Sequence, residues 1–287
     1  MKVSVRAIKN SFKSLQKGRL RWFVAVVASI EQSIRYFSPV LIYVDRDGDW
    51  YNCRRHFTLV APELNVTPRQ SAVRAVTDYW NWNHGVRTGN TVVDIGAGIG
   101  DDVVIFSELV GVEGCVVAIE ANPRTFRCLM KTVKANQLVN VVGVNAAIAD
   151  TNGYTNMSDE LNHLSNNIVS GRGDVSVRVL TLESALAEVN IESVDFVKMN
   201  IEGAEVAALR GMTELLKKIP RIVVSCHDFK ANRGEGECFR TFDDVKQILE
   251  KYFGVLRRAD DPRPEVSFYL YGSNSSVKRS APTSVLS

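Results

Sequence analysis

Apolar residues recur along this chain of 287 residues in two alternating patterns, which are short β-branched runs and longer segments with helical spacing. Runs expected to form strands lie at residues 91–93, 115–119, 141–144, 195–201, 222–227, 253–257 and 266–271. The segments between the first five runs carry apolar side chains every three or four residues, as amphipathic helices do. Strands that alternate with helices predict a parallel sheet, and the last two runs predict an antiparallel pair. We therefore predict an α/β fold with a doubly wound, mostly parallel seven-stranded Rossmann-like sheet.

Residues 1–85 precede this sheet and are expected to form an N-terminal extension. The stretch 40–60 has strand-like runs on both sides of D-R-D-G-D, whose Asp-Gly step is typical of a hairpin turn, and residues 69–83 return to helical spacing. We predict a basic helix, a hairpin and a second helix that cover the active site. The main domain is expected over residues 86–272, and the serine-rich, basic stretch 273–287 is predicted to be a disordered tail.

The first 21 residues carry seven Lys and Arg side chains, and the chain has no acidic residue before Glu31. Apolar residues recur at helical spacing through this region, and residues 22–30 are a short apolar run. Three interpretations fit the pattern: helices packed on the main domain with a solvated basic face, an interfacial helix lying on anionic lipid, or a signal peptide. The run is too short to span a bilayer.

Three glycines at alternate positions follow the first predicted strand of the main domain, and a carboxylate, Glu120, ends the second. Glycines let the backbone turn tightly and approach a ligand, and a carboxylate can accept hydrogen bonds from both hydroxyls of a ribose. The third glycine comes one residue too early for a dinucleotide fingerprint, and Asp101 and Asp102 would repel a pyrophosphate, with no Lys or Arg to offset them locally. Asp94, just before the glycines, is placed to meet a cationic ligand. S-adenosylmethionine, a sulfonium nucleoside without phosphate, fits this charge pattern better than NAD.

Three motifs make the interpretation more specific. D-I-G-A-G-I-G at 94–100 and I-E-A-N-P at 119–123 resemble the first two cofactor motifs of class I S-adenosylmethionine-dependent methyltransferases. D-F-V-K-M-N-I-E-G-A-E at 195–205 resembles the D-x-x-K-x-D-x-E-G-x-E signature of the FkbM-type family of that class. The resemblance covers residues 79–227. It implies an S-adenosylmethionine-binding methyltransferase domain that methylates a hydroxyl oxygen on a sugar, glycolipid or secondary metabolite.

The residues expected to hold the cofactor lie at the carboxyl ends of the predicted strands, where open parallel sheets bind ligands. From the motifs and the resemblance they are Asp94, Gly96, Ala97, Gly98, Gly100, Glu120, Ala121, Asn122, Asn145, Ala146 and Asn200. The resemblance sets Asn145 along the adenine. For catalysis, His227 is the leading general base, because the pKa of an unperturbed histidine lies near about 6.5. Glu202 is the second candidate, and Asn200 is expected to face the transferred methyl.

Two departures from the family pattern keep other functions open. Asn200 stands where the family has aspartate, and Ser225 stands where it often has glutamate. An amide keeps hydrogen-bonding capacity but carries no charge, which weakens the case for a proton acceptor or a metal ligand at that position. A non-catalytic cofactor-fold binding protein stays an alternative, as does, with less support, an NAD-dependent oxidoreductase. No metal site is predicted.

Composition adds few constraints. The net charge of +3 is too small to indicate nucleic-acid binding, so we expect a small-molecule or glycan hydroxyl acceptor as the partner. The five cysteines are odd in number and have no C-x-x-C spacing, which favours reduced thiols and a cytoplasmic protein, with peripheral membrane contact through the basic N-terminus as the alternative. The polar stretch 150–173 is expected to be an acceptor-side loop that enters a short hairpin.

Overall fold

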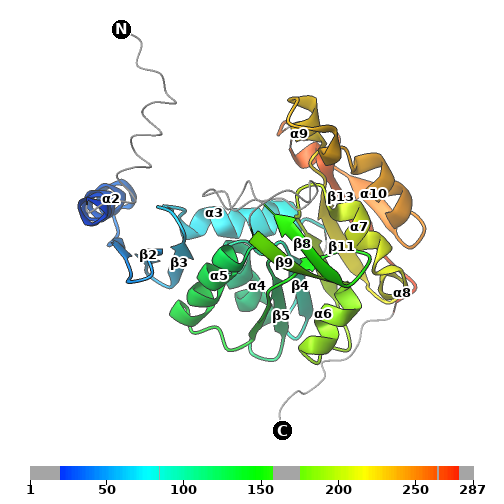
Figure 1. The fold of residues 1–287 in the computed structure, drawn as a ribbon, viewed down its shortest axis with the longest axis horizontal. Helices are drawn as coiled ribbons and strands as arrows, with labels where there is room; N and C mark the ends of the chain where they lie inside the picture. The colour runs from blue at the N-terminus through cyan, green and yellow to red at the C-terminus, as the bar shows by residue number, and fades with distance from the viewer. Residues whose placement is uncertain (1–19, 84, 158–174, 264, 278–287) are drawn as a thin grey trace.

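A seven-stranded sheet forms the centre of the protein in the computed structural model, which describes residues 20–83, 85–157, 175–263 and 265–277 (Figure 1). The strands lie in the order β12-β13-β11-β10-β4-β5-β6. Strands β11, β10, β4, β5 and β6 pair in parallel, and β13 runs antiparallel to both β11 and β12. Their bounds are β4 Thr91–Ile95, β5 Cys115–Ile119, β6 Val141–Val144, β10 Phe196–Met199, β11 Arg221–Ser225, β12 Gly254–Arg257 and β13 Tyr269–Ser273. The predicted fold class, with its antiparallel C-terminal pair, is confirmed.

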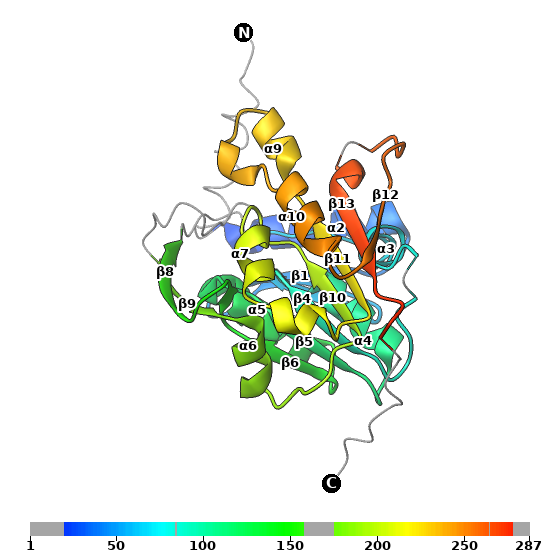
Figure 2. The same ribbon diagram turned by 90° about the vertical axis from the view of Figure 1, so that its right-hand side faces the viewer.

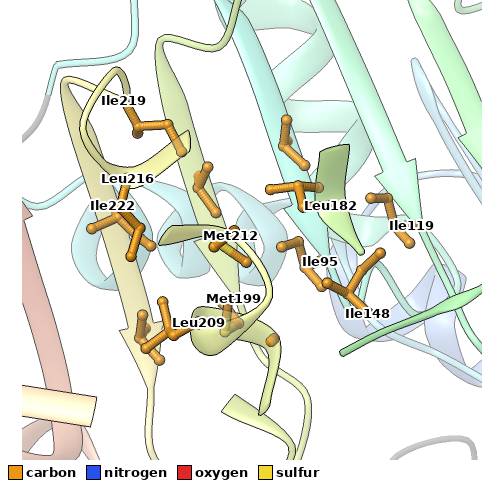
Figure 3. Close-up of a cluster of buried hydrophobic side chains, with 14 of the residues drawn as sticks. Ile95, Ile119, Ile148, Leu182, Met199, Leu209, Met212, Leu216, Ile219 and Ile222 are labelled. Atoms are coloured by element: carbon orange, nitrogen blue, oxygen red, sulfur yellow. The ribbon is translucent and has the colours of Figure 1, made fainter. Parts of the chain in front are cut away.

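Helices cover both faces of this sheet, so its parallel strands are buried on both sides and nearly continuous in apolar residues. Side chains alternate along each strand: Val93 and Ile95 pack into one cluster, and Val92 packs into the other. The first face carries α6 Leu182–Glu188, α7 Glu205–Arg210, α8 Thr213–Leu216 and α10 Phe242–Leu249 (Figures 2 and 3). The second carries α3 Arg69–Arg74, the π-helix η1 Ala75–Trp80, α4 Asp101–Val110 and α5 Pro123–Ala135.

The N-terminal extension contains a helix and a separate three-stranded antiparallel sheet. The helix is α2 Arg21–Tyr36, and the strands are β1 Leu41–Val44, β2 Trp50–Arg54 and β3 Phe57–Ala61. The expected single hairpin over 40–60 was therefore incomplete, because the chain turns a second time at Arg55-His56. His56 adopts a positive φ of 56° there. A non-glycine residue in that region is uncommon and gives no turn signal in the sequence.

Helix α5 holds this extension onto the main domain. Asn136, at its C-terminal end, exchanges hydrogen bonds with the backbone of Thr58, and the Val60 N–H donates to Thr132 Oγ1 at 2.9 Å. Lys131 Nζ lies 2.6, 2.7 and 2.6 Å from carboxylate oxygens of the three aspartates of the D-R-D-G-D turn, Asp45, Asp47 and Asp49. A cluster of three carboxylates has the composition of a cation site, but here the lysine ammonium supplies the positive charge.

A small second sheet and a short helical insertion complete the described chain. Strands β7 Ala147–Ile148, β8 Gly153–Met157 and β9 Val175–Leu180 pair in the order β7-β9-β8, with β8 and β9 antiparallel as the predicted hairpin requires. The insertion after β11 contains α9 Asp228–Asn232 and the 3₁₀ turn η3 Glu237–Phe239, and the turn η4 Val266–Phe268 precedes β13. Residues 158–173 of the expected acceptor-side loop, and most of the predicted tail, lie outside the described residues.

Two further observations concern the cysteines and the possibility of a membrane-spanning helix. All five cysteines are free thiols. Within the described ranges, none of the helices is both long enough and apolar enough to cross a lipid bilayer.

Candidate functional site

The three glycines after β4 form a tight turn that leads directly into α4. Gly96, Gly98 and Gly100 have φ values of 80°, 57° and 90°, a region that side-chain-bearing residues rarely adopt. A Cβ on Gly96 would lie 2.1 Å from the backbone oxygen of Asn200, so β10 and the turn approach too closely for any other residue. A Cβ on Gly98, in contrast, would meet no atom within 4 Å. The turn is therefore packed against β10 at Gly96 and open at Gly98.

Glu120, at the tip of β5, lies directly against this open part of the turn. Its two carboxylate oxygens accept hydrogen bonds from the backbone N–H groups of Gly98 and Asn122, at 3.0 and 2.9 Å. Burial raises the pKa of the Glu120 carboxyl to about 7, although both N–H donors act in the opposite direction. These two hydrogen bonds fix the orientation of the carboxylate, which keeps lone pairs for further donors.

A buried lysine lies behind the glycine turn. Lys198, on β10, is 1% exposed, and its Nζ is 2.6 Å from Asp94 Oδ1 on β4 and 3.6 Å from Asp102 Oδ2 on α4. The same ammonium donates to the carbonyl oxygen of Gly96 at 3.0 Å and lies 4.9 Å from the centre of the Trp80 ring. Burial raises the pKa of Asp102 to about 8. For Lys198, burial acts to lower the pKa, but the two aspartates raise it above its ordinary value.

This lysine corrects one sequence inference. No basic residue was expected to offset the acids near the turn, but Lys198 pairs with Asp94 because β10 lies beside β4 in the register that sets these residues opposite each other. Asp94 is fully buried, and its carboxylate contacts a lysine within the protein. A contact between Asp94 and the cofactor stays a prediction.

Other residues predicted to bind the cofactor lie at the same strand ends. Several of them also stabilise the local structure. Asn122 caps α5, its side-chain oxygen accepting from the N–H groups of Arg124 and Thr125. Asn145 donates both N–H bonds to backbone oxygens of Glu120 and Ala121, at 2.8 and 3.1 Å, so toward adenine it can offer only its oxygen. The buried methyl groups of Ala97 and Ala146 point into the two cores rather than outward.

The predicted general base lies at the tip of β11. His227 is 5% exposed, and its Nδ1 lies 2.9 Å from Oε1 of Glu205, which is fully buried in the first turn of α7. Glu205 also accepts hydrogen bonds from the Gly203 N–H, at 3.1 and 3.0 Å, and from the Thr241 hydroxyl, at 3.2 Å. A carboxylate held by these donors fixes the ring of His227 in one orientation.

The second catalytic candidate is paired differently. Glu202 Oε2 accepts a hydrogen bond from Lys230 Nζ, on α9, at 2.5 Å. Glu202 also adopts a positive φ of 53°, an uncommon conformation that turns the chain sharply between β10 and α7. Asn200, at the end of β10, is half-buried, and its backbone N–H donates to Ile95 at 2.9 Å. His227, Glu202 and Asn200 thus follow neighbouring strands.

The residues present fit the predicted cofactor. Open space lies over Gly98, and beside it a fixed carboxylate with remaining lone pairs suits the two hydroxyls of a ribose. The half-buried Asp101, at the start of α4, would repel a pyrophosphate, which favours a nucleoside without phosphate.

Two residues of the site, Lys198 and Glu205, were not singled out for a role from the sequence. Both belong to the K-x-N-x-E-G-A-E stretch that the family resemblance rests on. The signal that could have found them is spacing: Lys198 stands two residues before Asn200 on a strand expected to lie beside β4.

Comparison with known families adds an independent finding. The model described as "Methyltransferase FkbM domain" matches residues 94–254, which is more than half of the chain. A search of curated proteins found no match.

Solved structures are similar at low identity. A methyltransferase FkbM from Methylobacillus flagellatus is 16% identical, with a TM-score of 0.45, over 67% of this chain and 46% of its own, so the match spans about half of that protein. Aeropyrum pernix fibrillarin with natively bound S-adenosyl-L-methionine is 11% identical, with a TM-score of 0.42, over 82% and 99%. An S-adenosylmethionine-dependent methyltransferase from Aquifex aeolicus is 18% identical, with a TM-score of 0.41, over 72% and 97%. These values bear on neither the ligands nor the substrates of this chain.

The two glycines differ in a way that separates folding from binding. Gly98→Ala should cost about 1–2 kcal/mol of unfolding free energy, because the left-handed conformation strains a Cβ but no atom clashes with it. It should weaken binding of S-adenosylhomocysteine, the demethylated cofactor, by about tenfold or more, since the Cβ enters the ligand space. Gly96→Ala should be destabilised far more by its clash with Asn200. Chemical denaturation and calorimetry measure both quantities. Equal stability of the two variants would contradict this account.

Removal of Lys198 should be strongly destabilising. Lys198→Met leaves Asp94 buried without its counter-ion, and we expect a loss of about 3–5 kcal/mol in the free energy of unfolding. The double variant Lys198→Met/Asp94→Asn should regain part of that loss, because no uncompensated charge remains. Lys217→Met, which removes an exposed ion pair with Glu214, is the matched control and should unfold like the wild type. Urea denaturation of the four proteins measures these differences in unfolding free energy. A wild-type midpoint for Lys198→Met would refute the structural role of Lys198.

Proposed function

This chain belongs to the FkbM methyltransferase family, and from that premise we propose that it transfers a methyl group from S-adenosylmethionine to a hydroxyl oxygen of a sugar, glycolipid or secondary metabolite. The family assignment predicted from the sequence motifs is thereby confirmed. The choice of an oxygen acceptor is supported by one observation above all, the buried His227–Glu205 pair at the tip of β11.

The cofactor-binding half of the proposal rests on the tips of β4 and β5. Glu120 would accept hydrogen bonds from the ribose hydroxyls, and the turn at Gly98 would let the nucleoside approach the backbone. Asn145, whose donors are already engaged, would offer its side-chain oxygen to the adenine amino group. When bound, S-adenosylmethionine supplies an electrophilic methyl group. The protein then has to align the acceptor oxygen and exclude water.

His227 is suited to take the proton that a hydroxyl acceptor must lose. The Glu205 carboxylate accepts from Nδ1–H, which assigns the neutral ring the tautomer with a free lone pair on Nε2. In this proposal the acceptor proton moves to Nε2, and Glu205 stabilises the imidazolium that forms. Glu205 is a positioning residue, because it acts through His227.

The roles of the two residues after β10 follow from their partners. Glu202 accepts a hydrogen bond from the ammonium of Lys230, so one of its carboxylate oxygens is already engaged. We infer that Glu202 holds the insertion containing α9 against the site. Asn200, the residue that departs from the family aspartate, would contribute hydrogen bonds without charge. The non-catalytic alternative depends on this departure and on Ser225, and the His227–Glu205 pair argues against it.

Loss of the histidine should separate catalysis from cofactor binding. His227→Gln is expected to lower turnover by about 10²–10⁴-fold, because the general base is gone, while calorimetric affinity for S-adenosylhomocysteine changes little. Glu205→Gln should lower kcat with little effect on the KM for the cofactor. The exposed histidine variant His56→Gln is the matched control and should keep wild-type activity. Transfer of radiolabelled methyl groups to fractionated cell extract, followed by purification of the labelled acceptor, provides the assay. Wild-type turnover in His227→Gln would exclude the proposed base, and no transfer by the wild type would favour the binding protein.

Cofactor affinity should depend on pH through Glu120. Its carboxyl pKa of about 7 means that the group is largely protonated at pH 6 and ionised at pH 8, and only the ionised form can accept hydrogen bonds from both ribose hydroxyls. S-adenosylhomocysteine should therefore bind about tenfold more tightly at the higher pH and release close to one proton when it binds at the lower pH. Calorimetry in buffers of different ionisation enthalpy measures both effects. Glu120→Gln should bind weakly and without this pH dependence. If the affinity of Glu120→Gln for S-adenosylhomocysteine changed with pH as in the wild type, the titrating group would be another residue.

A further inference from the structure

Helix α2 has a fixed inner face, which determines what its other side presents. Val24 and Ala25 pack into a small core with β1 and Trp50. The hydroxyl of Ser29 accepts a hydrogen bond from the Ile42 N–H at 2.8 Å, and that of Ser33 accepts one from Val40 at 2.9 Å. These contacts hold the helix at one rotation about its axis.

The opposite side of α2 is apolar and exposed. At about 100° per residue, its large apolar side chains fall within an arc of roughly 140°. We name this the outer face; it consists of Trp22, Phe23, Val26, Val27, Ile30, Ile34 and, just beyond the helix, Phe37. Phe23 and Ile34 are each 68% exposed and Phe37 is 97% exposed, so this is a contiguous patch rather than scattered residues. The helix lies at the edge of the molecule, on the side away from α10 (Figure 1).

The charge of the sequence that precedes α2 indicates what the outer face binds. Seven Lys and Arg residues lie between Lys2 and Arg21, and no acid occurs before Glu31. The helix of 16 residues is about 24 Å long, and like the other described helices it is not long and apolar enough to cross a bilayer. An apolar face beside a basic segment is the pattern of a helix that lies in the plane of a membrane interface.

We propose that the outer face of α2 docks on an anionic lipid bilayer. The apolar side chains enter the boundary between headgroups and acyl chains, and the basic segment contacts the anionic headgroups. Trp22, at one end of the face, suits the headgroup level because its ring is amphipathic. A second copy of the chain is a poorer occupant, since pairing two outer faces brings two basic segments together. The proposal is independent of the methyl-transfer chemistry.

Vesicle co-sedimentation of the full chain tests the proposal. With vesicles of equal parts phosphatidylcholine and phosphatidylglycerol, the wild type should sediment, and with phosphatidylcholine alone its partition should fall about tenfold or more, because the basic segment loses its partner. Phe23→Gln/Ile30→Gln should reduce partition onto the anionic vesicles by about tenfold or more, since two apolar side chains no longer enter the interface. Val112→Gln/Val139→Gln, which replaces exposed apolar residues elsewhere, is the matched control and should sediment like the wild type.

Circular dichroism and thermal unfolding establish that each variant is folded, as expected for exposed positions. No sedimentation of the wild type with anionic vesicles would overturn the proposal, as would equal sedimentation of Phe23→Gln/Ile30→Gln. Analytical ultracentrifugation without lipid provides the remaining comparison. A dimer that the same double variant dissociates, with no binding to vesicles, would assign the outer face to a second copy of the chain.

Discussion

The ion pair between Lys198 and Asp94 is the interaction on which the rest of the site depends. The pair joins β10 to β4 below the glycine turn. The ammonium of Lys198 also lies near Asp102 on α4 and donates a hydrogen bond to the carbonyl oxygen of Gly96. A buried charge is costly without its partner, so the three segments that surround the turn cannot separate without exposing or stranding a charge. The turn is consequently held in its open conformation by the fold itself. A site that is already ordered loses less entropy when a ligand binds.

This ion pair also changes how the charge of the site should be understood. Asp94 and Lys198 compensate each other in the interior, and burial keeps the pKa of Asp102 high, so none of these groups presents a net charge to a ligand over the turn. The carboxylates that remain on the ligand side are Glu120 and the half-buried Asp101. Because burial keeps the pKa of Asp102 at about 8, selection against a pyrophosphate rests on Asp101, one residue fewer than the two acids that the sequence suggested.

The parts of this structure that the sequence predicted are those with local signals. Periodicity identified the strands and helices, and the glycine and K-x-N-x-E-G-A-E motifs identified the family. What it missed depends on contacts between distant residues. The second turn of the N-terminal sheet occurs at His56, and no turn-forming residue in the sequence indicates the positive φ of that histidine. Lys198 and Asp94 are 104 positions apart, and Glu205 and His227 are 22 apart. The register of β10 against β4 sets Lys198 opposite Asp94, and that register depends on the packing of the whole sheet.

The strand order places the proposed cofactor-binding residues on one half of the sheet and the proposed catalytic residues on the other. The chain fills one side with β4, β5 and β6 and then crosses to place β10 and β11 on the other, so the order reverses between β4 and β10. In sheets of this order, the loops that follow these two strands leave in opposite directions, and ligands bind at the carboxyl ends of the strands. Glu120 and the glycine turn follow β5 and β4, and Glu202, Glu205 and His227 follow β10 and β11 on the other side. A donor held by the first side and an acceptor held by the second would meet at the reversal, next to Asn200. The close contact of Gly96 with Asn200, which tolerates no Cβ, sets how near the two sides lie.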